Sequence, residues 1–459
     1  MEPVSRVPTM KDIYAYIDAH AAEFVADLQT FVQQPSISAQ DIGLRECAAL
    51  IRDMMHRDGL PAAFHELDDG PPVVYGEIRS KSRKTLLCYS HYDVQPPEPI
   101  EAWNHGGPWS GAVVDGVLYG RGATDNKSGV LAFNKAAKAF LAVRGEVPVG
   151  LKIMIEGEEE IGSPNLGPWA KKNAKMLEAD GMHCLDGSLE IGVEVPDVSL
   201  GLKSVLFVEL IARGPRTDVH SLNAPLVPNP VWDLVHALAT IMDREKNILI
   251  PNWAEGIYVP NDEDMGYLAD KAARIDFSML KDEMGVDRFA LGREGVDALK
   301  ARTYEPTANI QGITGGYTGK GTKTIVPSEA RVRMDFRLIP NISPAKAIIK
   351  LRNHLKAEGF DNIEVVGEAR TEDPYKISSR EDIAVSIIAA AHEVYGEPPI
   401  VNGVSAEGAI LKHVWIPCVL TGFANPGCNL HAPDENIHVN KYIQGIKYAA
   451  AIMEHFGRS

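Results

Sequence analysis

Two hydrophobic patterns alternate along the first part of the chain. Apolar residues repeat with a helical period in some segments, whereas other segments are short continuous apolar runs typical of buried strands. The helical segments are residues 10–32, 46–56 and 127–143, and the strand-like runs are residues 85–89 and 152–155. Helices that alternate with buried strands are typical of α/β proteins. We therefore expect an α/β fold with a mixed, mostly parallel sheet flanked by helices.

The pattern changes from about residue 201 to residue 375. Residues 330–338 alternate apolar and charged positions, as a half-solvated strand does. Two more strands are expected at 204–212 and 362–366, with a helix at 344–358 that Ser343 can cap. After residue 375 the first hydrophobic pattern returns, with helices expected at 382–395 and 441–455 around a strand at 418–423. We predict one α/β domain from residues 1–200 and 376–459, with an α+β domain, 201–375, inserted in it.

Charge and cysteine content narrow the classes of function. The chain has 459 residues, and 46 Lys and Arg against 62 Asp and Glu give a formal charge of −16, so we expect no nucleic-acid partner. No run approaches the ~18 apolar residues that a membrane span needs, and the first 23 residues lack a signal-peptide pattern. The five cysteines are scattered, which indicates free thiols or small buried hydrophobic residues. These features predict a soluble, cytoplasmic protein with no membrane partner.

Four segments combine acidic residues or histidine with a predicted strand or helix end. They contain His91 with Asp93, then Asp125, then the acidic run 156–160, and finally His431. Open α/β sheets bind ligands beyond the carboxyl ends of their strands, so these side chains are well placed to meet. Imidazole nitrogens and carboxylate oxygens suit zinc or manganese.

Each segment also has a simpler interpretation. The two histidines can be ordinary loop residues, Asp125 can be a helix N-cap, and the 156–160 run can be a solvated acidic turn. Residues 119–129 contain two early glycines but lack the third glycine and the long apolar strand of a dinucleotide-binding loop. Only the combination of the four segments favours a metal site.

In this order and spacing, the four segments resemble the co-catalytic dizinc metallopeptidase family. That family includes carnosine dipeptidases, aminoacylases, glutamate carboxypeptidases and succinyl-diaminopimelate desuccinylase. The resemblance extends over nearly the whole chain through Asp218-Val219-His220-Ser221, Gly321 to Pro327 and Arg337-Leu338-Ile339-Pro340. The dipeptidase branch is the closest match. The resemblance implies that the α/β domain is catalytic, that the inserted domain is a lid or dimerisation domain, and that the protein is a homodimer.

The resemblance also implies two divalent metal ions, with zinc expected first and manganese or cobalt as alternatives. Asp125 would bridge the two ions. His91 and Asp186 would complete one site, and Glu160 and His431 the other. Asp180 is a nearby competitor of Asp186. In the family, the peptide bond after the bridging aspartate is typically cis.

The family pattern assigns the chemistry to neighbours of these ligands. Glu159 would be the general base, because a carboxylate beside a water held by two dications can accept its proton and pass it to the leaving amine. Asp93 would hold His91 in the required tautomer. His220 is the candidate that stabilises the oxyanion, often from the other subunit of a dimer. An ordinary loop histidine is the alternative for His220.

Substrate contacts are implied at three further residues. Arg337 and Thr324 would bind the carboxylate end of the substrate, because a guanidinium fork grips a carboxylate bidentately. A structural ion pair within a strand is the competing interpretation for Arg337. The family's Gly-Gly-Ser-Ile-Pro-like segment is altered here to Gly403-Val404-Ser405-Ala406-Glu407, which makes Ser405 a weaker candidate. Glu407 either meets a substrate cation or is solvated.

The expected reaction is metal-dependent hydrolysis of the amide bond of dipeptides or similar small peptides. A deacylase of N-acyl amino acids is the alternative, since the same metal centre serves both bonds. A non-catalytic metal-binding homologue is the remote alternative, and Glu159 argues against it because binding needs no base.

Overall fold

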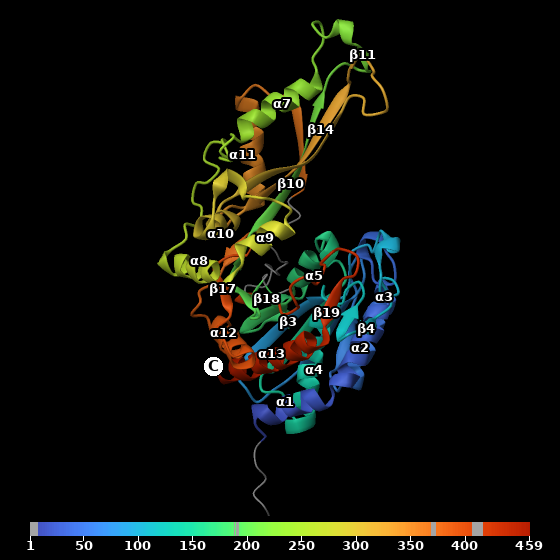
Figure 1. Cartoon of the computed structure of the whole chain (residues 1–459), viewed down its shortest axis with the longest axis vertical. Coiled ribbons are helices and arrows are strands. Elements are labelled where there is room, and N and C mark those ends of the chain that lie inside the picture. Colours follow the sequence, from blue (N-terminus) through green and yellow to red (C-terminus); the bar gives the residue numbers. More distant parts are fainter. Residues whose placement is uncertain (1–7, 188, 190–191, 369–372, 406–415) are drawn as a thin grey trace, which may run out of the picture.

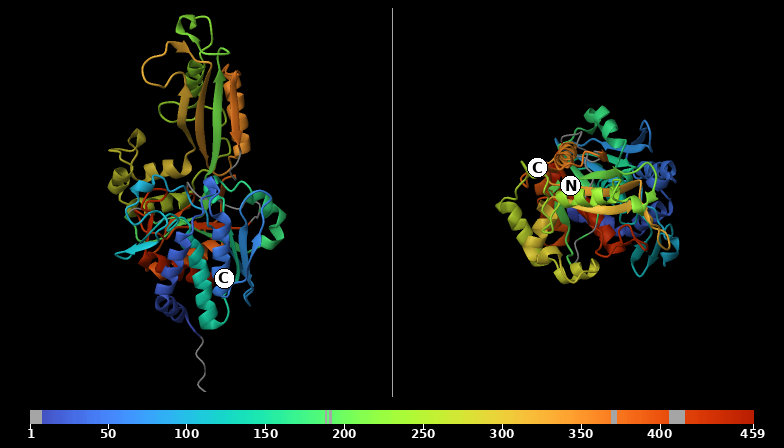
Figure 2. Two further views of the ribbon diagram at one scale, coloured as in Figure 1. Left: turned by 90° about the vertical axis from the view of Figure 1, so that its right-hand side faces the viewer. Right: turned by 90° about the horizontal axis from the view of Figure 1, so that it is seen from above.

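The chain forms two lobes that remain distinct when the molecule is turned (Figure 1 and Figure 2). The coordinates are a computed structural model and describe residues 8–187, 189, 192–368, 373–405 and 416–459. The larger lobe lies at the bottom of Figure 1 and contains both β3 and β18, whereas β10, β14 and β11 rise into the upper lobe.

An eight-stranded sheet organises the larger lobe. Its order is β1-β2-β6-β3-β7-β18-β8-β17. The bounds are β1 Ala62–His65, β2 Val73–Ile78, β3 Thr85–His91, β6 Gly150–Glu156, β7 Gly181–Leu185, β8 Asp197–Ser199, β17 Ile400–Asn402 and β18 Cys418–Thr421. Four of the neighbouring pairs are parallel and three are antiparallel. The predicted mixed, mostly parallel sheet is therefore confirmed.

Helices cover both faces of this sheet, and the central strands are apolar for that reason. Along β3, Leu86 and Cys88 face one core, while Leu87 and Tyr89 face the other. The first core contains α1 Met10–Ala19, α2 Ala21–Gln33, α3 Leu44–Arg57, α4 Lys127–Arg144, α12 Asp382–Tyr395 and α13 Val439–Arg458, and the second contains α5 Leu166–Lys172 and α6 Ala174–Leu177. Burial on both faces explains why no period-2 alternation marks these strands.

The expected single helix at 10–32 is instead two helices. At His20 the backbone (φ −105°, ψ 11°) leaves the helical conformation for one residue, while the apolar period continues from Ile17 to Phe24. The periodic pattern therefore did not mark the break.

A four-stranded antiparallel sheet, β12-β14-β10-β15, forms the upper lobe. Its strands are β10 Ser204–Arg213, β12 Thr307–Gly315, β14 Glu329–Leu338 and β15 Ile363–Glu368, and the helices α7 Pro230–Ile241 and α11 Pro344–Ala357 share its core. Val332, Met334, Phe336 and Leu338 of β14 are all buried, as the alternating pattern predicted. Ser343 occupies the N-cap position of α11, but its side chain makes no capping hydrogen bond.

The remaining strands are short and form small sheets, one of them where the two lobes meet. Where the chain passes from one lobe to the other, β9 Gly201–Leu202 pairs with β16 Tyr375–Lys376. The strand β11 Val219–His220 pairs with β13 Ile325–Val326, and β4 Ala112–Val114, β5 Val117–Tyr119 and β19 Asn436–His438 form a small sheet.

Three helices from the middle of the range 201–375 return to the large sheet. They are α8 Asp262–Arg274, α9 Phe277–Glu283 and α10 Gly295–Tyr304. Leu268 and Leu299 share a core with Ile400 of β17, at the edge of the large sheet. Part of the range expected to form an inserted domain therefore packs beside the first lobe, and the domain division stays a prediction.

Two general sequence expectations concern membranes and thiols. In the described part of the chain, no helix combines the length and the apolar character that a membrane span requires. All five cysteines lie within the described residues and are buried thiols.

Candidate active site

The carboxyl ends of three adjacent strands bring the five expected metal ligands together. His91 is the last residue of β3, Asp186 follows β7, and Glu160 lies in a short 3₁₀ helix (Glu159–Ile161) just after β6. Asp125 precedes α4, and His431 lies in the loop before β19. These positions follow from the order β6-β3-β7, which places the three strand ends side by side.

The five side chains form two groups that share Asp125. One group is His91, Asp125 and Asp186, and the other is Asp125, Glu160 and His431; in each group the candidate ligand atoms lie within 4.8 Å of one another. Nε2 of His91 is 3.1 Å from Oδ1 of Asp125, and Nε2 of His431 is 3.0 Å from Oδ2 of the same carboxylate. One carboxylate thus faces both groups, as a bridging ligand must.

The competitor Asp180 lies elsewhere. Its Oδ2 accepts a hydrogen bond from the backbone N–H of Thr85 at 2.7 Å. Thr85 begins β3 and His91 ends it, so Asp180 is about 20 Å away along a strand that rises ~3.3 Å per residue. Asp186 is therefore the aspartate that the fold brings to the cluster.

Two buried atoms in the cluster fit a divalent cation. Nε2 of His91 is buried and has no hydrogen-bond partner among the described residues, although two carboxylates lie within 3.6 Å of it. Oε1 of Glu160 is likewise buried and has no hydrogen-bond partner in the described part of the chain, whereas its Oε2 accepts a hydrogen bond from Gln95 at 2.8 Å. Unpaired lone pairs of this kind are costly in a protein interior unless another group binds them. The donor set of imidazole and carboxylate groups suits zinc, manganese or cobalt.

The pKa shifts in the cluster also favour a site for bound cations. Burial raises the pKa of Glu160 to about 8, and the nearby Asp125 carboxylate adds to the shift. Burial also raises the pKa of Glu159 to about 7. Burial would raise the pKa of Asp125 too, but the His431 and His91 imidazoles beside it hold that pKa below its ordinary value. Like charges this close destabilise one another, and bound cations offset that repulsion.

Asp93 contacts His91, as the sequence suggested, and also the turn that carries Glu159 and Glu160. Its Oδ1 is 3.4 Å from Nδ1 of His91, and its carbonyl oxygen is 3.1 Å from the same nitrogen. Its carboxylate also accepts the backbone N–H groups of Glu159 at 3.2 Å and Glu160 at 3.1 Å. Asp93 is fully buried, so one residue orients the histidine through its carbonyl oxygen and the turn that carries both glutamates through its carboxylate.

Two buried residues that received no role from the sequence support Asp125 and Asp186. The Asp125-Asn126 peptide bond is cis, as the resemblance implied, and Nδ2 of Asn126 donates to Oδ1 of Asp186 at 2.6 Å. Glu435 accepts the backbone N–H of Asp125 at 3.0 Å. Asn126 follows Asp125 directly and Glu435 lies four residues after His431, but the sequence gives no signal of which neighbours of the expected ligands turn inward.

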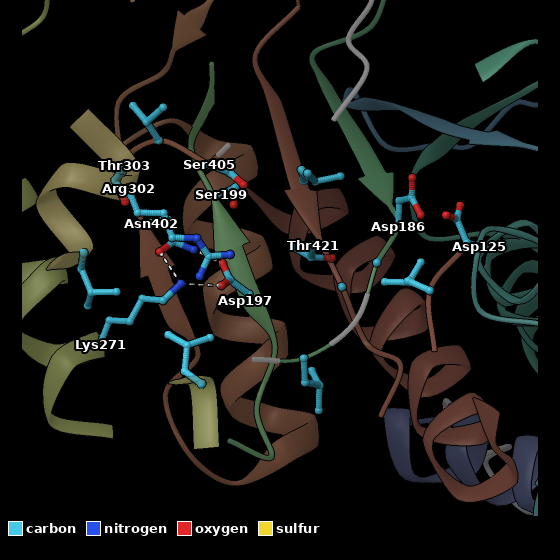
Figure 3. Close-up of a pocket in the computed structure, with 18 of the residues that line it drawn as sticks. Asp125, Asp186, Asp197, Ser199, Lys271, Arg302, Thr303, Asn402, Ser405 and Thr421 are labelled. Carbon is cyan, nitrogen blue, oxygen red and sulfur yellow. Dashed lines mark hydrogen bonds and ion pairs between the residues drawn. The ribbon is translucent and has the colours of Figure 1, made fainter. Parts of the chain in front are cut away.

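A cavity of about 690 Å³ extends from this cluster across the large sheet. Asp125, Glu159, Glu160, Asp186 and His431 line one end. Figure 3 shows Asp125 and Asp186 on one side of Thr421, with Asp197, Lys271, Arg302 and Asn402 on the other. Nζ of Lys271 donates to Asn402 at 3.1 Å and to Asp197 at 3.2 Å, which closes the far end with a polar network.

The expected substrate residues separate into two sets. Arg337 and Ser405 both line the cavity, and Nε of Arg337 is 4.0 Å from Oδ2 of Asp335. His220 and Thr324 lie together instead in the upper lobe, where β11 is far from β3 and β18 (Figure 1). Nε2 of His220 is 3.5 Å from Oγ1 of Thr324, and His220 is exposed. Glu407 lies outside the described residues.

Comparison with known proteins places the chain in one family. Residues 87–455 match the model of peptidase family M20/M25/M40. The human Beta-Ala-His dipeptidase is 28% identical over 96% of this chain and 92% of its own length. The Cys-Gly metallodipeptidase DUG1 of Saccharomyces cerevisiae is 26% identical over 98% of this chain and 99% of its own length.

Solved structures give the same result. The M20 family metallo-carboxypeptidase Sso-CP2 from Sulfolobus solfataricus superposes with a TM-score of 0.88 at 34% identity, covering 95% of this chain and 100% of that one. Human carnosine dipeptidase 1 superposes with a TM-score of 0.78 at 26% identity, covering 98% of this chain and 100% of that one. Because the family model matches most of the chain and these structures share its fold, the chain belongs to peptidase family M20/M25/M40.

Proposed function

We propose that this protein is a two-metal dipeptidase that hydrolyses the amide bond of dipeptides or similar small peptides. The observation that carries the proposal is the pair of ligand groups that share Asp125, with Glu159 lining the same cavity. The dipeptidases among the relatives, one named for Beta-Ala-His and one for Cys-Gly, support this reaction class.

Five residues would hold two divalent ions, of which zinc is our first expectation. His91, Asp125 and Asp186 would hold one, and Asp125, Glu160 and His431 the other. Such ions polarise a carbonyl oxygen and lower the pKa of a water molecule toward neutrality. Manganese and cobalt suit the same nitrogen and oxygen ligands.

Glu159 would take the proton of the attacking water and later give it to the leaving amine. Burial raises the pKa of Glu159 above that of an ordinary carboxyl group, which makes this carboxylate a better proton acceptor. Asp93 would keep Glu159 in place through its hydrogen bond to the Glu159 backbone. Arg337 and Ser405, which line the cavity, would bind the carboxylate end of the peptide.

We further propose a homodimer in which His220 and Thr324 of one subunit complete the site of the other. Within one chain these two residues lie in the upper lobe, away from the ligand cluster (Figure 1). Leu222 and Leu226, just after His220, are 81% and 80% exposed, which suits a surface that a partner covers. A cytoplasmic location also remains our prediction, since the cysteines are buried thiols.

The test is hydrolysis by metal-stripped protein reloaded with zinc or manganese, over a panel of dipeptides and N-acetyl or N-succinyl amino acids. We expect cleavage of free-amine dipeptides that requires metal. Cleavage of the acylated amino acids alone would assign the protein to the deacylases instead. No hydrolysis of any panel substrate with both ions bound would contradict the proposal.

Two glutamine variants separate the base from its acidic neighbours. Glu159→Gln should bind metal normally and lose about 10²- to 10⁴-fold in kcat, the usual contribution of a general base. Glu158→Gln is the matched control, because Glu158 lies in the same acidic run but its carboxylate accepts hydrogen bonds from Asn165, at 2.9 Å and 3.3 Å. Equal losses in the two variants would contradict the assignment of Glu159.

A further inference from the structure

Glu435 is a buried carboxylate that gathers four hydrogen bonds from one short segment. It is fully buried. Its Oε1 accepts the backbone N–H groups of Thr124 and Asp125, each at 3.0 Å. Its Oε2 accepts the backbone N–H of Gly122 at 3.0 Å and Nη1 of Arg121 at 2.8 Å. The segment that ends in the shared ligand Asp125 is therefore wrapped around one side chain.

The backbone of Glu435 is fixed as firmly as its side chain. Its carbonyl oxygen accepts the N–H of Gly120 at 2.9 Å, and the next residue, Asn436, pairs with Tyr119 in the small sheet. The N–H of Asn436 also donates to the carbonyl of Cys428 at 2.9 Å, which closes the loop that carries His431. Glu435 thus connects the segment of Asp125 to the loop of His431.

We propose that Glu435 is a positioning residue that sets the separation between Asp125 and His431, and with it the affinity of the metal site formed by Asp125, Glu160 and His431. The inference rests on the proposed function for the presence of metal ions. His431 needs such support, because its side chain is 54% exposed and its backbone has a positive φ of 58°. Nε2 of His431 nevertheless lies 3.0 Å from Asp125.

Only a carboxylate can satisfy this set of donors. Glutamine of the same shape would retain one oxygen and present an NH₂ group to the other two donors, so one pair of donors would lose its acceptor. Arg121 is 1% exposed and forms its ion pair with Glu435, so removing the negative charge would also leave a buried guanidinium without compensation. We expect the 121–125 segment to shift and the Asp125–His431 spacing to change.

The experiment is a calorimetric titration of zinc into metal-free wild-type protein, Glu435→Gln and Glu435→Asp. Glu435→Asp keeps the charge but is one methylene shorter, so it keeps Arg121 compensated while it cannot reach all four donors. Both variants should bind one ion about 10- to 100-fold more weakly than wild type, with the second ion less affected, as is usual for groups that orient ligands. Excess zinc should restore kcat with KM unchanged.

Asp58→Asn is the matched control for a purely structural effect. Asp58 has a fully buried carboxylate that forms ion pairs with Lys135 and Lys138. Lys135 lies about 12 Å along α4 from Lys127, where the helix begins next to Asp125 and Asn126. This variant should lose stability and keep both zinc affinities. Wild-type affinities for both ions in Glu435→Asp, whether or not Glu435→Gln folds, would overturn the inference. The titration needs no turnover, so a failed peptide assay would contradict the proposed function and leave this inference standing.

Discussion

Substitution of Asp93 by asparagine tests how the turn with the two glutamates is held. The carboxylate of Asp93 is fully buried and accepts the backbone N–H groups of Glu159 and Glu160 through separate oxygens. Asparagine keeps the size of the side chain but replaces one acceptor oxygen with an NH₂ donor. One of the two backbone N–H groups would then face another donor.

The expected loss of stability follows from these two hydrogen bonds. A buried N–H without an acceptor costs ~1–3 kcal/mol, and the remaining bond loses its charge assistance, about 1 kcal/mol more. The free energy of unfolding should therefore fall by ~2–4 kcal/mol. Because the turn positions Glu159, kcat should fall about 10- to 100-fold, the usual effect of removing a group that orients an active site.

Denaturant unfolding of the metal-free protein measures the stability term, and single-substrate kinetics at saturating metal measures kcat. Asp276→Asn is the control, because Asp276 also accepts two backbone N–H groups, from Ser278 at 2.8 Å and Met279 at 3.2 Å. Asp276 is an exposed helix N-cap, where asparagine caps about as well as aspartate. Its variant should differ from wild type by less than ~0.5 kcal/mol.

An Asp93→Asn protein as stable as wild type would show that the two backbone hydrogen bonds contribute nothing measurable. An unchanged kcat, together with the expected loss of stability, would show that the turn keeps Glu159 in place without Asp93. Either result would refute the reasoning about this carboxylate.

Three further predictions concern the dimer, the metal and acid stability. If His220 acts in trans, mixing inactive His220→Ala with inactive Asp125→Ala should restore activity to about a quarter of wild type after subunit exchange. Half of the dimers are then mixed, and each mixed dimer has one intact site of two. No recovery would place His220 in cis or outside the site. Zinc at 100 times its dissociation constant should stabilise the metal-free protein by about 2.7 kcal/mol in thermal or denaturant unfolding, and an unchanged midpoint would argue against a site in the native state. Burial would raise the pKa of Asp58, but Lys135 and Lys138 lower it below its ordinary value. The stabilising effect of Asp58 is then present above about pH 4 and disappears as pH falls through its lowered pKa, so wild type and Asp58→Asn should differ in stability at pH 7 and converge in strong acid; a constant difference would contradict this.

The sequence was sufficient for the elements that depend on neighbouring residues. The continuous apolar runs marked β3 and β6 because these strands are buried on both faces, and alternation marked β14 because its apolar side chains face one core. The fold class and the peptidase family predicted from the sequence are confirmed. The structure brings the five expected ligands together, and their roles as ligands remain our proposal.

Some features depended on contacts that no local pattern encodes. The return of α8 to α10 to the large sheet has no sequence signal, because an amphipathic helix does not specify which apolar surface it covers. The polar network of Lys271, Asp197 and Asn402 at the far end of the cavity results from that return. The place of His220 in the upper lobe is also a property of the whole fold.

The sequence by itself determined which imidazole and carboxylate groups stand at strand and helix ends, because each motif joins such an end to these side chains over a few residues. The tertiary structure decided how those residues are held. Asp93 reaches across 66 residues to the Glu159 backbone, and Glu435 reaches across 310 to that of Asp125. Such contacts depend on the order of strands in the sheet, which brings distant segments together and leaves no trace in the residues on either side.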